Sequence, residues 1–488
     1  MLTERGHDVH LVYSTLKTEE SQEALERFAE GDPRLTISRL PRPARTPLAS
    51  LSEDLRRSAD HLLYLDPVYA GAPKLRERRA RRAPAAAQRL GHIARPLGPG
   101  VLRMLRGALR AFDRTLEPPS VLEDILRAQV PDVVLTTTLV SVGLPHADLV
   151  RAAKRLRIPT GYLVFSWDNL TNKGLIREIP DQVLVWNDLQ AREAVELHDV
   201  PESRVRVTGA PSYDHWFTWA PSRSRDEFAH LVGLDPDRPI VLYVCSTHFV
   251  APNEAVFVRR WIRALREHGG PTAEVGILVR PHPLNIREWR DTRLDLPDVV
   301  VWPPHGQEPI DRESRQNYFD SIYHADAVVG INTSAQIEAA IVGRPVHTVL
   351  ADEYRETQDG TLHFRYLHDE AFGHLHVART LDEHVALLGS SIRGETDPER
   401  NERFVRRFLR PLGLDVAATA VVVEAIEELE GRRPVAGRRG MLAPAVDRGA
   451  HYLAAISWRR RRSTRRRLKE RPRPPRPIEA GGGMAPPR

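Results

Sequence analysis

Short runs of apolar, often β-branched residues alternate with amphipathic segments along most of the chain. Runs such as DVVLTTT (132–138) and TGYLVF (160–165) are nearly continuous in apolar residues, as is typical of parallel strands covered on both faces. Between them, ADLVRAAKRL (147–156) and FVRRWIRALREH (257–268) place apolar residues at helical spacing. This alternation predicts an α/β protein with parallel sheets. The predicted strands lie within 7–14, 35–40, 132–138, 160–165, 181–186, 205–209, 239–245, 274–280, 299–303, 326–333 and 345–350.

The same alternation occurs in two halves, separated near 217–238 by turn-forming segments such as WAPSRSR and GLDPDRP. We therefore predict a first Rossmann-like domain over 1–217 and a second over 218–431, facing each other across a cleft. Beyond the last predicted helix, Pro, Gly and Arg dominate the sequence. Residues 432–488 are accordingly predicted to form a basic, mostly disordered tail.

The chain begins within LTERGHD, which resembles the end of a helix, so the first strand expected of this kind of sheet is missing. That strand is central in the common strand order. We hypothesise a misplaced gene start or a fragment, and an in-frame stop codon immediately upstream would contradict this.

Composition and cysteine content place the chain among ordinary globular proteins. Of its 488 residues, 41% are hydrophobic and 28% charged, which excludes a disordered or collagen-like chain. No stretch approaches the roughly 20 apolar residues of a membrane-spanning helix. The single cysteine, Cys245, excludes an intrachain disulfide and is typical of a reducing compartment, so we predict a cytoplasmic protein.

The net charge of +6 conceals two strongly basic segments on an otherwise acidic chain. Residues 74–110 contain 11 Lys and Arg with one acid, and residues 432–476 contain 16 with two acids. The helical pattern at 101–112 suits an interfacial helix, so residues 74–110 are expected to contact an anionic membrane, and the basic tail at 432–476 would reinforce this contact. A helix packed on the domain explains the pattern equally well. Nonspecific attraction to nucleic acid is the rival for the tail, but scarce aromatic residues argue against base stacking, and we predict no specific nucleic-acid partner.

Polar residues gather where the predicted strands end, and this is where open parallel sheets bind ligands. In the second half, Ser246 and Thr247 follow one strand, and Arg280 and His282 follow the next. Turns after strands are polar in most proteins, so no single position identifies a site. Their occurrence in both halves predicts a ligand-binding cleft between the domains.

The segment 330–346 is the most informative one. A strand ends there, and Thr333 and Ser334 open a helix whose N-terminal amides and hydroxyls would form a phosphate site. Glu338, about one turn further, would accept hydrogen bonds from a ribose. The structural alternative is a plain capping box formed by Thr333 with Gln336.

A second phosphate-binding candidate is the sequence Arg-Pro-His-Pro at 280–283. The two prolines would hold the loop rigid around His282, whose imidazole would donate to a phosphate oxygen and, when protonated, offset leaving-group charge. Arg280 would supply a fixed positive fork. A purely structural histidine is the alternative.

With these motifs, the second half resembles the nucleotide-sugar domain of GT-B glycosyltransferases that carry His-Pro and Ser-Ser or Ser-Thr motifs. Bacterial sialyltransferases, capsule Kdo transferases and teichoic-acid glycerophosphotransferases are of this kind. The resemblance covers about residues 1–430 in architecture and implies that His282 and Ser334 bind the donor phosphate and Glu338 the ribose. This chain has Thr333 where those families often have a first serine. The non-hydrolysing UDP-N-acetylglucosamine 2-epimerases are similar in architecture, but their expected His-Arg-Arg-Glu-Asn run is missing.

The first half is expected to bind the acceptor and to supply a base. We predict Asp168 in FSWDNLTNKG as the base, with Asn169 and Lys173 beside it on the acceptor side. An Asx turn is the structural alternative. Asp214 is the second candidate, with a helix cap as its alternative, and His363 is expected to line the cleft.

No metal or cofactor motif is evident. Asp235 and Asp237 imitate a DxD motif but lie in a proline-bounded turn, so we predict a metal-independent enzyme without a cofactor. The predicted function is transfer of a sugar or polyol-phosphate group from a nucleotide-activated donor to a surface-glycan or lipid-linked acceptor. The alternatives are an epimerase-like enzyme, a catalytically inactive nucleotide-sugar-binding protein, and a nucleic-acid-binding protein acting through its tail.

Overall fold

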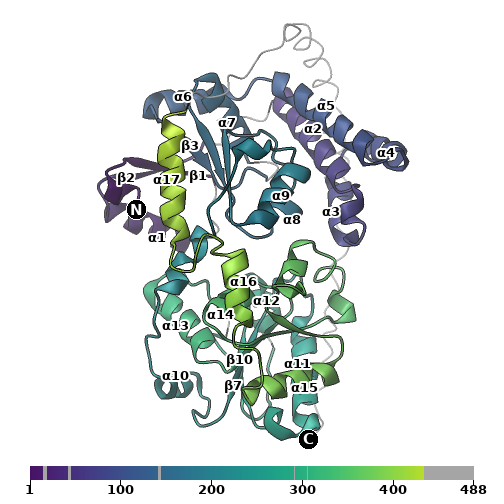
Figure 1. Ribbon diagram of the computed structural model, residues 1–488, viewed down its shortest axis with the longest axis vertical. Coiled ribbons are helices and arrows are strands. Elements are labelled where there is room, and N and C mark those ends of the chain that lie inside the picture. The colour runs from purple at the N-terminus through teal and green to yellow at the C-terminus, as the bar shows by residue number, and fades with distance from the viewer. Residues whose placement is uncertain (15–18, 42–45, 141–143, 291, 305, 433–488) are drawn as a thin grey trace, which may run out of the picture.

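The computed structural model describes residues 1–14, 19–41, 46–140, 144–290, 292–304 and 306–432. The predicted tail, apart from its first residue, lies outside the described residues. Every described strand pair is parallel, and the strands form three sheets of two, four and six strands. The predicted α/β fold with parallel sheets is confirmed, and Figure 1 shows the two halves of the chain one above the other.

The first domain is built on a four-stranded sheet in the order β3-β4-β5-β6. Tyr162, Val164, Val183 and Val185 are fully buried in this sheet, as their apolar runs predict. The strands are β3 (Val134–Thr136), β4 (Thr160–Leu163), β5 (Gln182–Val185) and β6 (Val205–Val207). The helices between and beside them are α6 (Ser120–Gln129), α7 (His146–Arg155), α8 (Asn169–Asn172) and α9 (Asp188–Glu196).

The first two strands form a separate sheet. β1 (Val9–Tyr13) pairs only with β2 (Leu35–Arg39) among the described strands, and α1 (Glu19–Glu30) connects them. Val12 packs against a small core that includes Val134 of β3. The two sheets of this domain therefore share a core without hydrogen-bonding to each other.

A helical arm follows β2 and contains most of the first basic segment. It consists of α2 (Pro47–Leu63), α3 (Pro73–Arg82), α4 (Ala85–Ala94) and α5 (Pro99–Thr115). The apolar face predicted for membrane contact at 101–112 is packed inside the protein: Leu102 is buried in one core with Leu62 of α2, and Arg106 and Arg110 are buried beside Asp199. The interfacial interpretation of that face is wrong, because the amphipathic pattern does not reveal which surface covers it.

The second domain contains a six-stranded sheet in the order β12-β11-β10-β7-β8-β9. Separate apolar cores cover its two faces. Its strands are β7 (Ile240–Val244), β8 (Gly276–Arg280), β9 (Val299–Val301), β10 (Ala327–Gly330), β11 (Val346–Val349) and β12 (Leu375–Ala378). Its helices are α10 (Arg225–Val232), α11 (Glu254–His268), α12 (Ile286–Arg290), α13 (Arg312–Tyr323), α14 (Ala335–Ile341), α15 (Leu381–Ile392) and α16 (Arg400–Phe408). Only β12 of these strands lacks a predicted counterpart.

The last described helix returns to the first domain. α17 (Ala418–Glu430) packs Val422 and Ala425 against Leu184 of β5, and Figure 1 shows it beside the first sheet. From sequence, this segment was predicted to belong to the second domain. The amide N–H of Ala210 donates to the carbonyl of Leu409 at 2.9 Å, so the two chain crossings between the domains lie side by side.

Candidate functional site

Three neighbouring strands of the second sheet end in line. The register aligns Gly330 of β10 with Val244 of β7, and Val244 with Arg280 of β8. The loops that carry Ser334 and His282 therefore leave the same edge, from strands about 10 Å apart. This alignment brings the two predicted phosphate motifs to one edge of the sheet.

Ser246 supports the loop that carries Ser334. Its hydroxyl and the amide N–H of Asn332 are 3.3 Å apart, and its own amide N–H donates to Glu254 Oε2 at 2.8 Å. The side chain is fully buried. The Ser246 hydroxyl is thus engaged with the backbone of the loop after β10, and donor binding by this residue stays a prediction. Thr247 after it is half-buried and leads to the exposed Phe249.

Thr333 and Ser334 differ in their surroundings. The Thr333 amide N–H donates to Gln336 Oε1 at 3.2 Å, and its hydroxyl accepts from the Ala335 amide at 3.4 Å, which is a capping arrangement. Ser334 is exposed, and its side chain makes no cap hydrogen bond to α14. Ser334 therefore presents its hydroxyl at the start of a helix, where an anion is favoured.

His282 is half-buried in the loop after β8. Its Nδ1 accepts from the amide N–H of Leu284 at 3.0 Å, which places the proton of the neutral ring on Nε2. The loop thus fixes both the orientation and the tautomer of this imidazole. A ring held in this way is suited to donate a hydrogen bond to a phosphate oxygen.

Arg280, predicted to bind phosphate, is instead held inside the second domain. Its guanidinium lies 5.0 Å from the ring centre of Tyr318 and 5.4 Å from that of Trp302, and it donates to Ser321 at 3.0 Å. Burial lowers the pKa of Arg280 to about 10. The side chain therefore packs against other residues of the second domain. The sequence does not show this, because a residue that ends a strand points to either face of the sheet, depending on its register.

Glu338 is half-buried and accepts a hydrogen bond from the Tyr318 hydroxyl. Burial raises the pKa of this carboxyl to about 7. One of its oxygens is therefore already engaged, and the group is close to half-protonated at neutral pH. Its predicted contact with a ribose remains a prediction.

The first domain presents Asp168 at the end of β4. Its Oδ1 accepts from the Ser166 hydroxyl at 2.8 Å, and its Oδ2 lies 2.9 Å from Lys173 Nζ. Burial raises the pKa of Asp168, but the charges of Lys173 and His363 and the hydrogen bonds outweigh this effect, so the pKa is lowered overall. Asn169, predicted to face the acceptor, is buried, and its amide donates to the Tyr162 hydroxyl at 3.4 Å.

His363, a residue of the second domain, contacts the residues that flank Asp168. Its ring lies edge-on to Trp167 with centres 4.6 Å apart, and its Nδ1 is 3.4 Å from the Thr171 hydroxyl. Burial lowers its pKa to about 4 even though Asp168 acts in the opposite direction. The residue belongs to η9 (His363–His368), so Asp168 lies where the two domains meet.

Asp214, the second candidate base, has a structural role. Its carboxylate accepts from Arg410 at 2.9 Å and from both the amide and the hydroxyl of Thr419 at 2.6 Å. It also accepts from the Ala418 amide at 3.1 Å. These four bonds cap α17, so the structural alternative is the right one, although the capped helix is distant in sequence.

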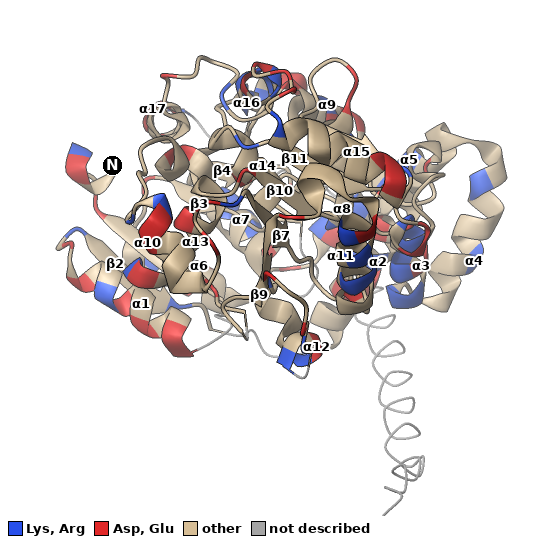
Figure 2. Ribbon diagram, turned by 90° about the horizontal axis from the view of Figure 1, so that it is seen from below, with Lys and Arg blue, Asp and Glu red and all other residues tan. Residues whose placement is uncertain are grey.

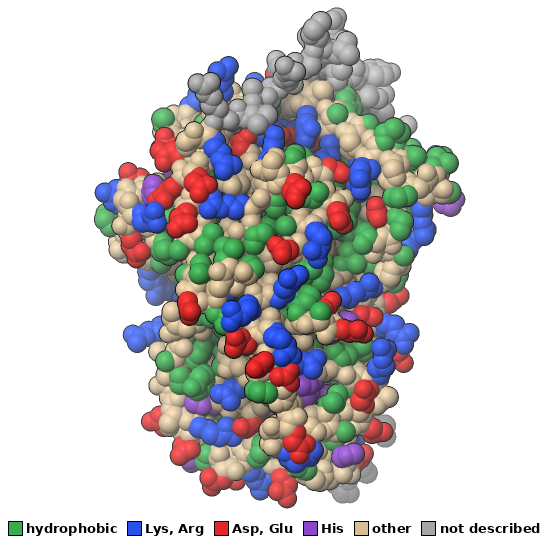
Figure 3. Space-filling model, viewed as in Figure 1, with side chains coloured by type: hydrophobic (Ala, Val, Ile, Leu, Met, Phe, Trp, Pro, Cys, Tyr) green, Lys and Arg blue, Asp and Glu red, His purple; other side chains and the backbone are tan. Residues whose placement is uncertain are grey.

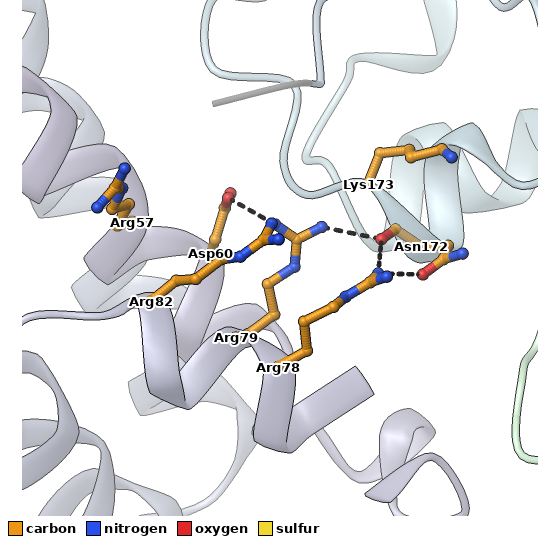
Figure 4. A pocket seen from close by; sticks show the side chains of 7 residues that line it. All are labelled: Arg57, Asp60, Arg78, Arg79, Arg82, Asn172 and Lys173. Carbon is orange, nitrogen blue, oxygen red and sulfur yellow. Dashed lines mark hydrogen bonds and ion pairs between the residues drawn. The ribbon is translucent and has the colours of Figure 1, made fainter. Parts of the chain in front are cut away.

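A basic cavity beside Asp168 was not predicted. It has a volume of about 290 Å³, and Lys173 and Asn172 connect it to the Asp168 loop. Figure 4 shows arginine side chains of α3 reaching toward Asn172. The charge excess of residues 74–110 was the available signal. The lining residues are Arg57, Asp60, Arg78, Arg79, Arg82, Asn172 and Lys173.

Two further findings bear on possible ligands and location. Among the described residues, no group of three or more His, Cys, Asp or Glu side chains is arranged to hold a metal ion. No helix in the described part of the chain has the length and apolar character needed to cross a bilayer.

No family model matches the chain, and no curated protein matches it. Solved structures similar to it include the UDP-GlcNAc 2-epimerase of Neisseria meningitidis bound to UDP-GlcNAc, with 13% identity, a TM-score of 0.45 and coverage of 86% of this chain and 99% of that one. MnaA of S. aureus with UDP shows 11% identity, a TM-score of 0.46 and coverage of 88% and 99%. A variant of the wall teichoic acid polymerase TagF shows 14% identity, a TM-score of 0.33 and coverage of 51% and 58%.

Proposed function

We propose that this protein transfers a sugar or polyol-phosphate group from a nucleotide-activated donor to a glycan or lipid-linked acceptor. The observation that carries the proposal is a charged carboxylate, Asp168, at the domain contact formed with His363. The second domain contributes the sheet edge with Ser334 and His282. Phe249, in the loop after β7, lies 4.9 Å beneath the guanidinium of Arg78, so this edge adjoins the Asp168 side.

In the proposed reaction, Asp168 takes the proton of an acceptor hydroxyl that attacks the donor. Lys173 keeps the carboxylate ionised before the transfer. The Nε2–H of His282 and the Ser334 hydroxyl stabilise the charge that develops on the leaving phosphate. We propose that these groups suffice without a metal ion, as in the prediction from sequence.

The location is also part of the proposal. We place the protein in the cytoplasm, in contact with an anionic membrane through the outer end of the helical arm. Ile93, Leu97 and Met104 are each about two thirds exposed there, and Arg95 and Arg103 accompany them. Figure 3 shows hydrophobic side chains at the place that α4 occupies in Figure 1. Such a surface suits the interface of anionic lipids.

The test combines donor binding with turnover. We expect thermal-shift measurements against CMP, CDP, UDP, GDP and their sugar or glycerol derivatives to identify one stabilising nucleotide class. Ser334→Ala and His282→Ala should weaken that binding, whereas Ser120→Ala, the same change at the start of α6, should not. Asp168→Asn should keep donor binding and lose turnover by about 10²–10⁴-fold.

Other outcomes identify the alternatives. If no nucleotide binds, the transferase proposal is rejected. If the donor sugar is isomerised without any acceptor, an epimerase-like activity replaces it. If nucleotides bind but no acceptor is modified and Asp168→Asn changes nothing, the protein is a binding protein.

A further inference from the structure

The cavity beside Asp168 carries a large excess of positive charge. Four arginines and one lysine line it, against one carboxylate, that of Asp60. Asp60 is itself occupied, because it accepts from Arg177 at 2.7 Å and from the Leu175 amide at 3.0 Å. Figure 2 shows Lys and Arg positions concentrated on α2 and α3, the helices that supply these arginines.

The arginines of α3 are held in place, and one of them is paired with the carboxylate that lines the cavity, because Arg79 lies 3.6 Å from Asp60. Arg78 and Arg79 each donate through Nη2 to the carbonyl of Asn172 at 2.8 Å, and the Nε of each is buried without a hydrogen-bond partner. Burial and the neighbouring Arg79 and Arg82 lower the pKa of Arg78. Arg82 is exposed and makes no hydrogen bond or ion pair with another described residue. Positive charges kept this close favour a bound anion.

The cavity lies on the first-domain side of the reaction site. Lys173 both lines it and pairs with Asp168 at 2.9 Å. α3 reaches the second domain through the Arg78 contact with Phe249 and through Lys74, which lies 3.2 Å from Glu356. None of its lining residues comes from the second-domain edge that we assign to the donor.

We propose that this cavity binds a phosphate or diphosphate group of the acceptor, so that the acceptor is a phosphate-bearing molecule rather than a neutral glycan. The identification of the ligand as the acceptor rests on the proposed function, whereas the anion site itself rests on the cavity alone. A volume of about 290 Å³ suits a compact anionic group and not an entire oligosaccharide. The planar guanidinium groups of the half-buried Arg78 and the exposed Arg82 suit the oxygens of a phosphate.

The test uses the full-length chain and inorganic pyrophosphate in isothermal titration calorimetry at fixed ionic strength. Arg82→Gln removes a charge that has no structural partner in the described part of the chain, and we expect it to weaken pyrophosphate binding about tenfold. Arg78→Gln should weaken it at least as much. The matched control is Arg81→Gln on the same helix, where the exposed side chain pairs with Glu77, and its effect should stay below twofold.

Each remaining outcome decides between the two proposals. Absence of pyrophosphate binding, or equal losses for Arg82→Gln and Arg81→Gln, overturns the anion site. Competition between nucleoside diphosphates and pyrophosphate, with equal sensitivity to Arg82→Gln, assigns the cavity to the donor and overturns the acceptor assignment. Pyrophosphate binding that depends on Arg82, in a protein that binds no nucleotide, supports the anion site and rejects the transfer reaction.

Discussion

The charge state of Asp168 depends on one neighbour. Burial alone would raise the pKa of this carboxyl, and Lys173 provides the largest opposing effect. We expect Lys173→Met to raise the pKa of Asp168, so that the base becomes protonated at higher pH. The acid limb of the pH profile of kcat/KM should move to higher pH.

The control for this change is Lys74→Met, because Lys74 is exposed and pairs with Glu356 outside the cavity. Its pH profile should match that of the parent protein. An unchanged acid limb in Lys173→Met would exclude Asp168 as the base.

A cluster of buried histidines makes the second domain sensitive to acid. His384 is fully buried, neither of its ring nitrogens has a hydrogen-bond partner, and burial lowers its pKa to about 4. The unfolded chain binds this proton near pH 6.5, so the stabilisation is complete above that value and is lost as the pH falls toward 4. The loss amounts to about 3 kcal/mol for this residue.

We expect His384→Leu to reduce the difference in unfolding free energy between pH 7.5 and pH 4.5, measured by urea denaturation. His92→Leu, a change at an exposed position of α4, should leave that difference as in the parent. If this free-energy difference were the same in the parent protein and in both variants, His384 would not be the cause of the acid sensitivity.

At the scale of elements, Asp214 holds α17 against the first domain. Asp214→Ala removes a helix cap and leaves the nearly buried Arg410 without its carboxylate. We expect a loss of about 3 kcal/mol in unfolding free energy, combining the cap with an unpaired buried charge. Urea denaturation measures it, and Asp415→Ala, an exposed change between α16 and α17, should cost less than about 0.5 kcal/mol.

The elements themselves were largely predictable. Each of β1 to β11 lies within a predicted apolar run, because buried parallel strands need apolar residues on both faces. β12 was missed because LHVA is short and interrupted by His376. α17 was predicted as a helix but not its partner sheet, since an amphipathic stripe does not specify what covers it.

The sequence predicted those parts of the candidate site that depend on local motifs, and not those that depend on how distant elements pack together. The edge that carries His282 and Ser334 follows from strand order and motifs. The burial of Arg280 and Ser246 did not follow from the sequence, because the direction of a strand-end side chain depends on tertiary packing. The basic cavity was missed for the same reason, as Arg57 and Arg78 come from different helices and meet Lys173 only in the fold.

At the scale of the whole molecule, the outer end of the helical arm predicts binding to membranes. We expect the protein to co-sediment with vesicles that contain anionic phosphatidylglycerol, and the double change Ile93→Ser with Leu97→Ser to reduce the bound fraction severalfold. Both side chains are exposed, so the fold should be unaffected. The control is Leu231→Ser, an exposed leucine of α10 in the second domain. If the parent protein and all variants bound the vesicles equally, the outer end of the helical arm would not be the membrane-binding surface.

The paired crossings at Ala210 and Leu409 have a mechanical consequence. Two covalent connections that lie side by side are an arrangement that would permit a hinge rotation between the domains. Such a rotation would leave the crossing itself nearly still and would separate the contacts made by Arg78 with Phe249 and by Lys74 with Glu356. Molecules would then enter and leave along α3, past the arginines, and the order in which substrates load would be set by which of them reaches those charges first.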